Sequence, residues 1–165
     1  GVTCYNMGVG KKRGVLHFTK EYGPGNHVVQ DQDSCESVEV PVTTLDNLYE
    51  SVKKTKEKVL LIKVDAEGWE APILEGSVTL SRSAPTALIL ELNDSGREYG
   101  FDEESTHQDL IALGYTPVSY RPFDRTLDVR EDRQLQGNTI YVNDLRFFRQ
   151  RLKESRHYEV LGIQL

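Results

Sequence analysis

The chain has 165 residues, of which 38% are hydrophobic and 28% are charged, and its formal net charge at pH 7 is −6. This length suits one domain with a core of its own, and the composition excludes a disordered or fibrous chain. The negative charge argues against a dedicated nucleic-acid or anionic-membrane binder, although Arg and Lys are frequent enough after Arg121 to form a local basic patch.

Hydropathy and cysteine spacing exclude further classes of protein. No stretch approaches the roughly 18 apolar residues that cross a bilayer, so no membrane span is predicted. Cys4 and Cys35 have neither a zinc nor a disulfide spacing, and we expect free thiols in a reducing, cytoplasmic compartment. Gly1–Tyr5 shows no signal-peptide pattern, and we expect a strand there that is entered from a missing upstream region.

Turn signals divide the first forty residues into short strands. The cluster Gly23–Asn26 separates the apolar runs Val15–Phe18 and His27–Val29, which predicts a hairpin-like excursion. Val38–Val42 alternates and contains a proline, which predicts an edge strand because proline cannot donate to a ladder. Gly8–Gly14 has neither the register of a dinucleotide-binding loop nor the ending of a P-loop, so we interpret it as a turn between strands.

From residue 43 onward, helical and strand patterns alternate. Thr43 and Thr44 can cap a helix, and the continuous apolar run Val59–Val64 then predicts a strand covered on both faces. A second helix is predicted to begin near Pro72, and Ala87–Leu92 is predicted to be a second buried strand. The apolar faces of the two helices consist of Leu45, Leu48, Tyr49, Val52, Ile73, Leu74, Val78 and Leu80.

The last third of the chain continues the same alternation. Ser105–Gln108 is typical of a capping box, which would start a helix that Gly114 ends and would place His107 on the surface. The polar stretch Asp124–Gln136 is predicted to be a long loop, and Leu145–Glu154 a basic helix. The two strands predicted before and after the loop are Thr116–Tyr120 and Asn138–Val142.

This alternation predicts an α/β fold with a doubly wound sheet. We expect a single domain in which residues 1–42 form a strand and hairpin region and residues 43–165 form the αβ core. Loops at the carboxyl ends of the strands line the ligand crevice of such a sheet. Because Asp65 and Glu91 lie at the ends of two predicted strands, we expect both at that crevice.

Three segments around these acids carry a family resemblance: Val42–Asp46, Leu61–Glu70 and Ile73–Gly76. Their motifs and spacing resemble the FkbM family of S-adenosylmethionine-dependent methyltransferases, which shows a T-x-D-like helix start, a K-[IV]-D-x-E-G-x-E turn and a V-L-x-G helix. The K-V-D-A-E-G-W-E turn is the specific part of the match. Asn6–Val9 and Gly137–Ile140 are similar to outer stretches of the family.

The resemblance implies S-adenosylmethionine as cofactor and a Rossmann-like class I methyltransferase sheet with strand order 3-2-1-4-5-7-6. It also implies a glycine-rich cofactor loop upstream, which these residues do not contain, so we expect the sheet to lack its first strands. With Val2–Tyr5 as strand 3 and Val59–Val64 as strand 4, the strands between them are missing. We therefore expect strand 4 to form an exposed apolar edge or to pair unusually.

The resemblance also implies roles for individual residues. Asp65 and Glu67 would be catalytic, and Asn6 and Asp65 would contact the cofactor. Glu91 and Asn93 would bind the substrate, a hydroxyl-bearing small molecule or sugar that is methylated on oxygen. No metal ligand and no nucleic-acid partner are predicted.

Two alternatives stay open for the acidic turn. Asp65 and Glu67 could bind a divalent cation, with Glu91 or Asn93 as a further oxygen ligand. They could also only cap the following helix, in a non-catalytic interaction module with the same fold. Within the turn, Trp69 is predicted to be a packing anchor and Glu70 a first-turn acid. Substrate choice is expected from the charged loops Asp94–Glu104 and Arg121–Gln136.

Overall fold

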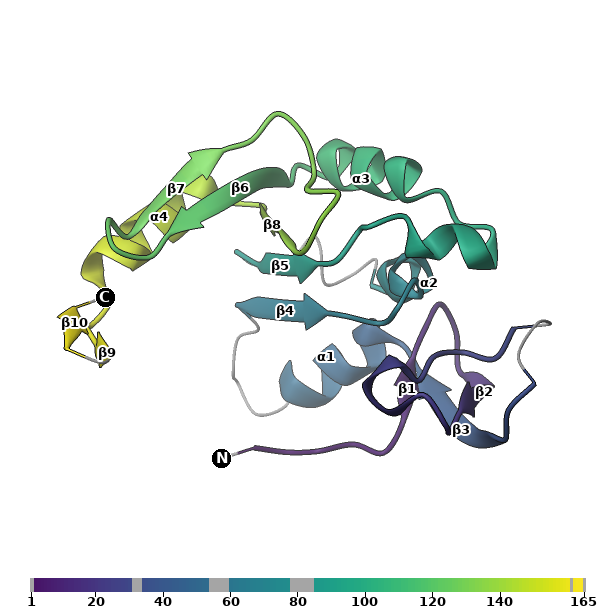
Figure 1. Cartoon of the computed structure of the whole chain (residues 1–165). Coiled ribbons are helices and arrows are strands. Elements are labelled where there is room, and N and C mark those ends of the chain that lie inside the picture. The colour runs from purple at the N-terminus through teal and green to yellow at the C-terminus, as the bar shows by residue number, and fades with distance from the viewer. Residues whose placement is uncertain (1, 31–33, 54–59, 78–84, 161, 165) are drawn as a thin grey trace.

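The strands form two main sheets and a small terminal hairpin (Figure 1). The computed structural model describes residues 2–30, 34–53, 60–77, 85–160 and 162–164. The smaller sheet has the order β1-β3-β2, from β1 (Gly8–Val9), β3 (Ser37–Thr43) and β2 (Gly14–Thr19). The larger sheet has the order β4-β5-β8-β6-β7, from β4 (Leu61–Val64), β5 (Ala87–Leu90), β8 (Thr139–Val142), β6 (Thr116–Arg121) and β7 (Thr126–Val129). Near the C-terminus β9 (Glu159–Val160) pairs with β10 (Ile163–Gln164).

The smaller sheet differs from the prediction in two ways. β3 pairs with β2 on one side and with β1 on the other, so it is a central strand and not an edge strand. Its proline is tolerated because β1 is short and pairs only with Val42 and Thr43, leaving Pro41 without a β1 partner. Val2–Tyr5 forms no strand; these residues are exposed. The turn interpretation holds for residues 11–13, which connect β1 to β2.

The larger sheet is mixed. β4 and β5 are parallel, β8 is antiparallel to both β5 and β6, and β7 is antiparallel to β6. The predicted loop Asp124–Gln136 therefore contains a strand, β7, which forms a hairpin with β6. The alternation Thr126, Leu127, Asp128 was a strand signal within that polar stretch, because Leu127 is the residue that becomes buried.

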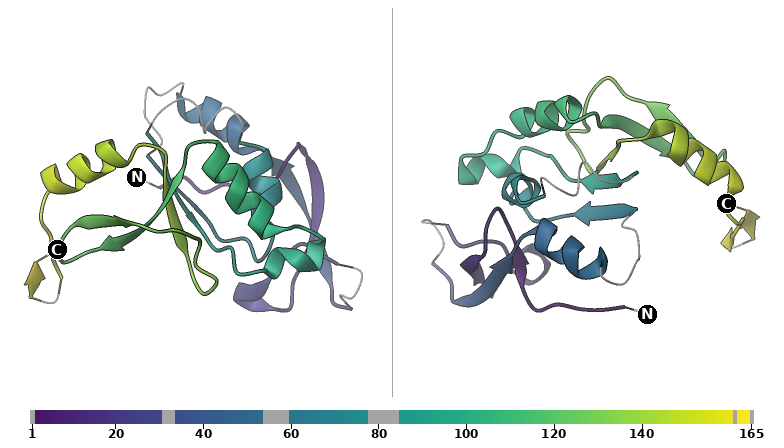
Figure 2. Two further views of the ribbon diagram at one scale, coloured as in Figure 1. Left: turned by 90° about the horizontal axis from the view of Figure 1, so that it is seen from above. Right: turned by 180° about the vertical axis from the view of Figure 1, so that it is seen from behind.

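Side-chain alternation separates two cores on opposite faces of the larger sheet. Leu88 and Tyr141 belong to the core beneath α2 (Glu70–Glu75) and α3 (Glu103–Ala112). Their neighbours Ala87 and Val142 belong to the other core, beneath α4 (Leu145–Glu154). Successive strand residues point to opposite faces, so both faces of β5 and β8 are covered. Figure 2 shows α4 lying along the β6–β7 hairpin.

β4 lies at the edge of the larger sheet. In the described part of the chain it pairs with β5 alone, and Leu61 is 57% exposed. The expected exposed edge is thus confirmed. The prediction that this strand is covered on both faces is wrong, because α4 packs over the other strands and leaves the second face of β4 open. Val59 lies outside the described residues.

Among the described helices, α1 (Leu45–Lys53) begins at the threonine cap that the sequence indicated. Thr44 Oγ1 accepts a hydrogen bond from the Asn47 N–H at 3.2 Å. α2 begins at Glu70, which confirms Pro72 in a first turn and Glu70 as a first-turn acid. α4 has the predicted bounds. Val78 and Leu80 lie outside the described residues. No described helix is long and apolar enough to cross a membrane.

Candidate active site

The pairing of β4 with β5 sets two acids side by side at the carboxyl edge of the sheet. Val64 is in register with Leu90, so Asp65 and Glu91 are the next residues along the two parallel strands. The Asp65 side chain is 42% exposed and forms an ion pair with Lys63. Glu91 Oε1 accepts a hydrogen bond from Asn93 Nδ2 at 3.3 Å. Three of the residues expected at the site therefore gather at one edge.

Backbone strain marks the turn that follows Asp65. Glu67 has φ 51° and Gly68 has φ 95°, and the Trp69 N–H donates to the Ala66 carbonyl at 3.1 Å. A left-handed conformation at a residue other than glycine is uncommon, and such residues cluster at functional sites. The helix begins only at Glu70, so Asp65 and Glu67 do not occupy its first turn.

The end of the turn is held by Glu70, which is buried. Its Oε1 accepts from the Ala66 N–H at 2.7 Å, while its Oε2 has no partner among the described residues. Burial raises the pKa of this carboxyl, against the backbone hydrogen bond from Ala66, which lowers it. Trp69 packs edge-on against Tyr99 and Phe101, with ring centroids 5.2 and 5.6 Å away, which confirms a packing role.

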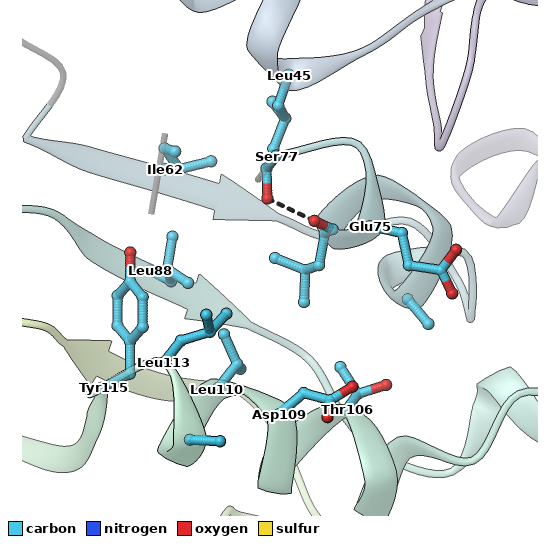
Figure 3. Close-up of a pocket in the computed structure, with 13 residues that line it drawn as sticks. Leu45, Ile62, Glu75, Ser77, Leu88, Thr106, Asp109, Leu110, Leu113 and Tyr115 are labelled. Carbon is cyan, nitrogen blue, oxygen red and sulfur yellow. Dashed lines mark hydrogen bonds between the residues drawn. The ribbon is translucent and has the colours of Figure 1, made fainter. Parts of the chain in front are cut away.

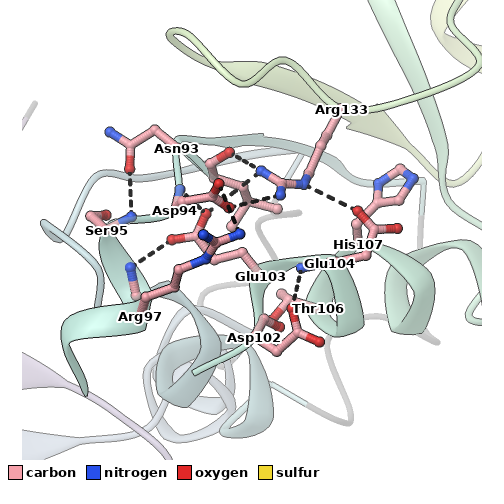
Figure 4. A network of polar contacts seen from close by, with 12 residues as sticks. Asn93, Asp94, Ser95, Arg97, Asp102, Glu103, Glu104, Thr106, His107 and Arg133 are labelled. Atoms are coloured by element: carbon pink, nitrogen blue, oxygen red, sulfur yellow. Dashed lines mark hydrogen bonds and ion pairs between the residues drawn. The ribbon is translucent and has the colours of Figure 1, made fainter. Parts of the chain in front are cut away.

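A second strained loop follows β5 and is clamped by one buried carboxylate. Asp94 has φ 71°, and Glu103 Oε2 accepts from its N–H at 2.6 Å, while Glu103 Oε1 accepts from the Gly96 N–H at 2.7 Å. Arg133 holds the same loop through an ion pair, with its Nη2 2.9 Å from Asp94 Oδ1 (Figure 4). It also donates a hydrogen bond to the Leu92 carbonyl. The loop between β7 and β8 is thereby joined to the loop after β5.

The buried arginine is strongly held in its charged form. Burial alone would lower the pKa of Arg133, but the hydrogen bond and charge of Asp94 outweigh it and raise the pKa, as does the charge of Glu103. Its Nη1 lies 3.7 Å from Glu103 Oε2 and its Nε lies 3.5 Å from Glu104 Oε2. Three carboxylates thus surround one cation.

The two strained loops touch each other through glycine. A Cβ on Gly68 would lie 2.8 Å from the backbone carbon and oxygen of Ser95, and a Cβ on Gly96 would lie 3.0 Å from Glu103 Oε1. Only glycine allows this close approach. The clamp at Glu103 therefore extends through the Asp94–Gly96 loop to the turn that carries Glu67.

His107 is buried, contrary to the surface position expected from the capping-box pattern. Asp102 is the N-cap of α3 and accepts from the Glu104 N–H at 3.1 Å, so the helix begins at Glu103 and not near Ser105. Glu103, His107 and Leu110 then share the inner face at helical spacing. His107 Nδ1 lies 2.8 Å from Tyr141 Oη, and its Nε2 lies 3.6 Å from Asp132 Oδ1. Burial raises the pKa of Tyr141.

The sequence of this chain can be compared with the profiles of known protein families. A sequence profile described as the methyltransferase FkbM domain matches residues 6–122, well over half of the chain. The chain belongs to the FkbM methyltransferase family. Comparison with curated proteins and with solved structures gave no match.

The FkbM match includes the acidic edge but ends before some of the residues that contact the loop after β5 and helix α3. It contains the turn after Asp65, the loop after β5 and the clamp residue Glu103. It ends at residue 122, before Arg133, Tyr141 and α4. Sequence reasoning missed Glu103 and Arg133 because neither belongs to a motif, and it misplaced His107 because of the capping-box pattern. The available signal was the charge of the two loops, which the ion pair between Arg133 and Asp94 brings together.

Asn6, expected to contact the cofactor, is exposed in the segment before β1. Among the described residues, no hydrogen bond or ion pair joins Asn6 to Asp65, and the cofactor role of Asn6 stays a prediction. In the same way, no described hydrogen bond or ion pair joins Asp65 to Glu67 or Glu91. Within the described ranges, no three His, Cys, Asp or Glu side chains converge to hold a metal.

An apolar pocket of about 390 Å³ lies between the larger sheet and helices α2 and α3 (Figure 3). Ile62 and Leu88 of the sheet, Leu74 of α2 and Leu110 of α3 form part of its wall. None of the expected site residues lines it. Burial raises the pKa of Tyr115, another lining residue, to about 12, so its phenol stays protonated at neutral pH. Glu75 and Asp109 also line the pocket. The strained turn and the paired strand ends lie at the carboxyl edge, however, and we place the candidate chemistry there.

Proposed function

We propose that this FkbM chain takes part in S-adenosylmethionine-dependent methylation of a hydroxyl group on a small molecule or sugar. The observation that carries the proposal is the acidic edge where β4 and β5 end, with Asp65 and Glu91 in adjacent register. The family match supplies methyl transfer as the reaction class. The cysteine content supports a cytoplasmic setting.

The order of the larger sheet supports a class I methyltransferase architecture. β4, β5, β8 and β6 follow one another as strands 4, 5, 7 and 6 of that sheet would, and β8 is the antiparallel member. In this assignment β4 is the strand beside which the first strand of a class I sheet would lie. The open edge of β4 agrees with it.

The chemistry of the side chains at the edge fits the cofactor. Carboxylates accept hydrogen bonds from ribose hydroxyls and from an amine, and they favour a nearby positive sulfonium. We assign cofactor contacts to Asp65 and Asn6. Bound S-adenosylmethionine would supply an electrophilic methyl group.

The chain's own residues would position the acceptor. Glu91 and Asn93 can hold substrate hydroxyls, and Asp65 and Glu67 can accept the hydrogen bond of the reacting hydroxyl and take its proton. Positioning of this kind accounts for much of the rate of a bimolecular transfer. The strained backbone at Glu67 and Asp94, fixed by the Glu103 clamp, keeps these groups in place.

Replacing Asp65 tests the proposal. The protein encoded by the complete open reading frame around these residues is incubated with methyl-labelled S-adenosylmethionine and a panel of sugars and hydroxylated small molecules. We expect methylated product with wild type and a loss of about 10²-fold or more with Asp65→Asn. Glu39→Gln removes an exposed acid from β3 of the smaller sheet, outside the residues assigned to the site, and should keep full activity. Equal rates for the two variants would refute the role of Asp65.

Cofactor binding by the 165-residue chain is a separate measurement. Because these residues contain no glycine-rich loop, we expect calorimetric titration with S-adenosylmethionine to show weak binding or none. Micromolar affinity would show that the carboxyl edge binds the cofactor without such a loop.

A further inference from the structure

The outward side of α4 carries positive charge that no described acid neutralises. Between Leu145 and Arg156 the sequence has four Arg and one Lys but a single acid, Glu154, whereas the chain as a whole has a net charge of −6. Arg146, Arg151 and Lys153 are exposed, and none of them forms an ion pair within the described part of the chain.

The other side of α4 explains why these cations stay outward. Leu145, Phe148 and Leu152 pack on the core of the sheet. At 3.6 residues per turn, Arg146 and Lys153 lie on one flank of the side facing away from that core. Arg151 lies on the other flank, with Glu154 between them. The helix is anchored by these apolar contacts and by a hydrogen bond from Arg149 to the Leu127 carbonyl.

The β6–β7 turn lies at the same end of the molecule as the end of α4. Arg125, in this turn, lies with Nη1 2.8 Å from His157 Nε2 and donates through Nη2 to Ser155. Figure 1 shows the turn, the end of α4 and the C-terminus together at one end of the molecule. Phe123 in the turn is 68% exposed, and Tyr158 is exposed beside Arg156, whose guanidinium lies 5.9 Å from the ring centroid.

Unneutralised cations beside exposed aromatic rings are typical of surfaces that bind anionic membranes. We propose that α4 and the β6–β7 turn bind the surface of an anionic phospholipid bilayer. The three cations lie over the headgroups, and Phe123 enters the interface. A bilayer is favoured over a nucleic acid because Phe123 projects from a tight turn, whereas base stacking needs a ring that lies along a backbone-tracking groove.

Vesicle sedimentation tests this surface without any assay of methyl transfer, so its result is independent of the proposed function. The 165-residue chain is mixed with vesicles of phosphatidylcholine alone or with added phosphatidylserine. We expect binding only to the anionic vesicles and weaker binding at higher salt. Each cation contributes about fivefold to partitioning, so the triple variant Arg146→Gln, Arg151→Gln, Lys153→Gln should bind about a hundredfold more weakly.

A control variant distinguishes the effect of where the cations lie from the effect of the net charge of the protein. Lys11→Gln, Lys12→Gln, Lys20→Gln removes the same number of positive charges from the smaller sheet region and should bind like wild type. Phe123→Ser should weaken binding in a way that salt changes little, because the lost contact is apolar. Thermal unfolding of each variant verifies that it folds.

Three results would overturn the proposal. The first is wild-type binding that is absent or equal on neutral and anionic vesicles. The second is an equal loss of binding in the two triple variants. The third is a single-stranded RNA oligonucleotide that binds more tightly than the anionic vesicles and displaces them, which would make this surface a nucleic-acid site.

Discussion

Replacing Glu103 with glutamine alters a buried carboxylate on which both strained loops depend. The side chain is 2% exposed and accepts from two backbone N–H groups, those of Asp94 and Gly96, at 2.6 and 2.7 Å. Glutamine has the same shape but only one acceptor oxygen. Its NH₂ group would face one of the two N–H donors, so one hydrogen bond is lost and a buried donor is left unpaired.

The expected cost follows from these contacts. A hydrogen bond to a charged group contributes about 1.5–3 kcal/mol, and loss of the negative charge also weakens the pairing with Arg133. Asp94 and Glu104 still compensate that arginine. We therefore expect Glu103→Gln to destabilise the fold by about 3 kcal/mol, which lowers the melting temperature by roughly 6–12 °C for a chain of this size.

Urea unfolding followed by circular dichroism measures this loss, with Glu104→Gln as the matched control. Glu104 is the next residue, is 53% exposed and lies 3.5 Å from Arg133 Nε, so its removal should cost less than about 1 kcal/mol. If the two variants lose the same stability, the clamp does not hold the loop as described.

Two further predictions concern Gly68 and Tyr115. Gly68→Ala brings a Cβ to 2.8 Å from the Ser95 backbone at a residue with φ 95°, and we expect a loss of about 1–3 kcal/mol in urea unfolding. Gly14→Ala, which has open space around it, is its control, and equal losses would contradict the steric argument. Burial raises the pKa of Tyr115 from 10.0 to about 12, so its neutral phenol stabilises the fold fully below pH 10 and this contribution is lost as the pH rises toward 12. Tyr115→Phe should unfold with a flatter pH dependence over that range, and an unchanged profile would show that Tyr115 is not the titrating group.

The position of His107 shows where local pattern reasoning failed. Ser105–Gln108 fits a capping box, and so His107 was expected at the surface. Asp102 is an equally good cap three residues earlier, and the structure uses it. Starting the helix at Glu103 brings this residue into the helix four positions before His107, so both side chains lie on one face. Glu103 and His107 then face the core because Arg133 and Tyr141, distant in sequence, can satisfy them there.

Two predictions were made about the edge strand β4, of which one was correct and one was wrong. Continuous apolar residues indicated a strand covered on both faces, whereas the strand numbering implied by the family resemblance indicated an open edge. The second was confirmed. The apolar residues of a strand show which of its faces can be buried. Whether a helix actually covers each face depends on the rest of the fold.

The local sequence was therefore sufficient to predict the helices and strands whose signals lie within one short segment. Apolar periodicity and caps indicated α1, α4, β5, β6 and β8, and the K-V-D-A-E-G-W-E turn indicated the family and the acidic edge. Tertiary structure alone decided the hairpin partner of β6 and the network around Arg133. Those features join segments tens of residues apart, and a charged side chain becomes buried only where distant backbone and countercharges meet it.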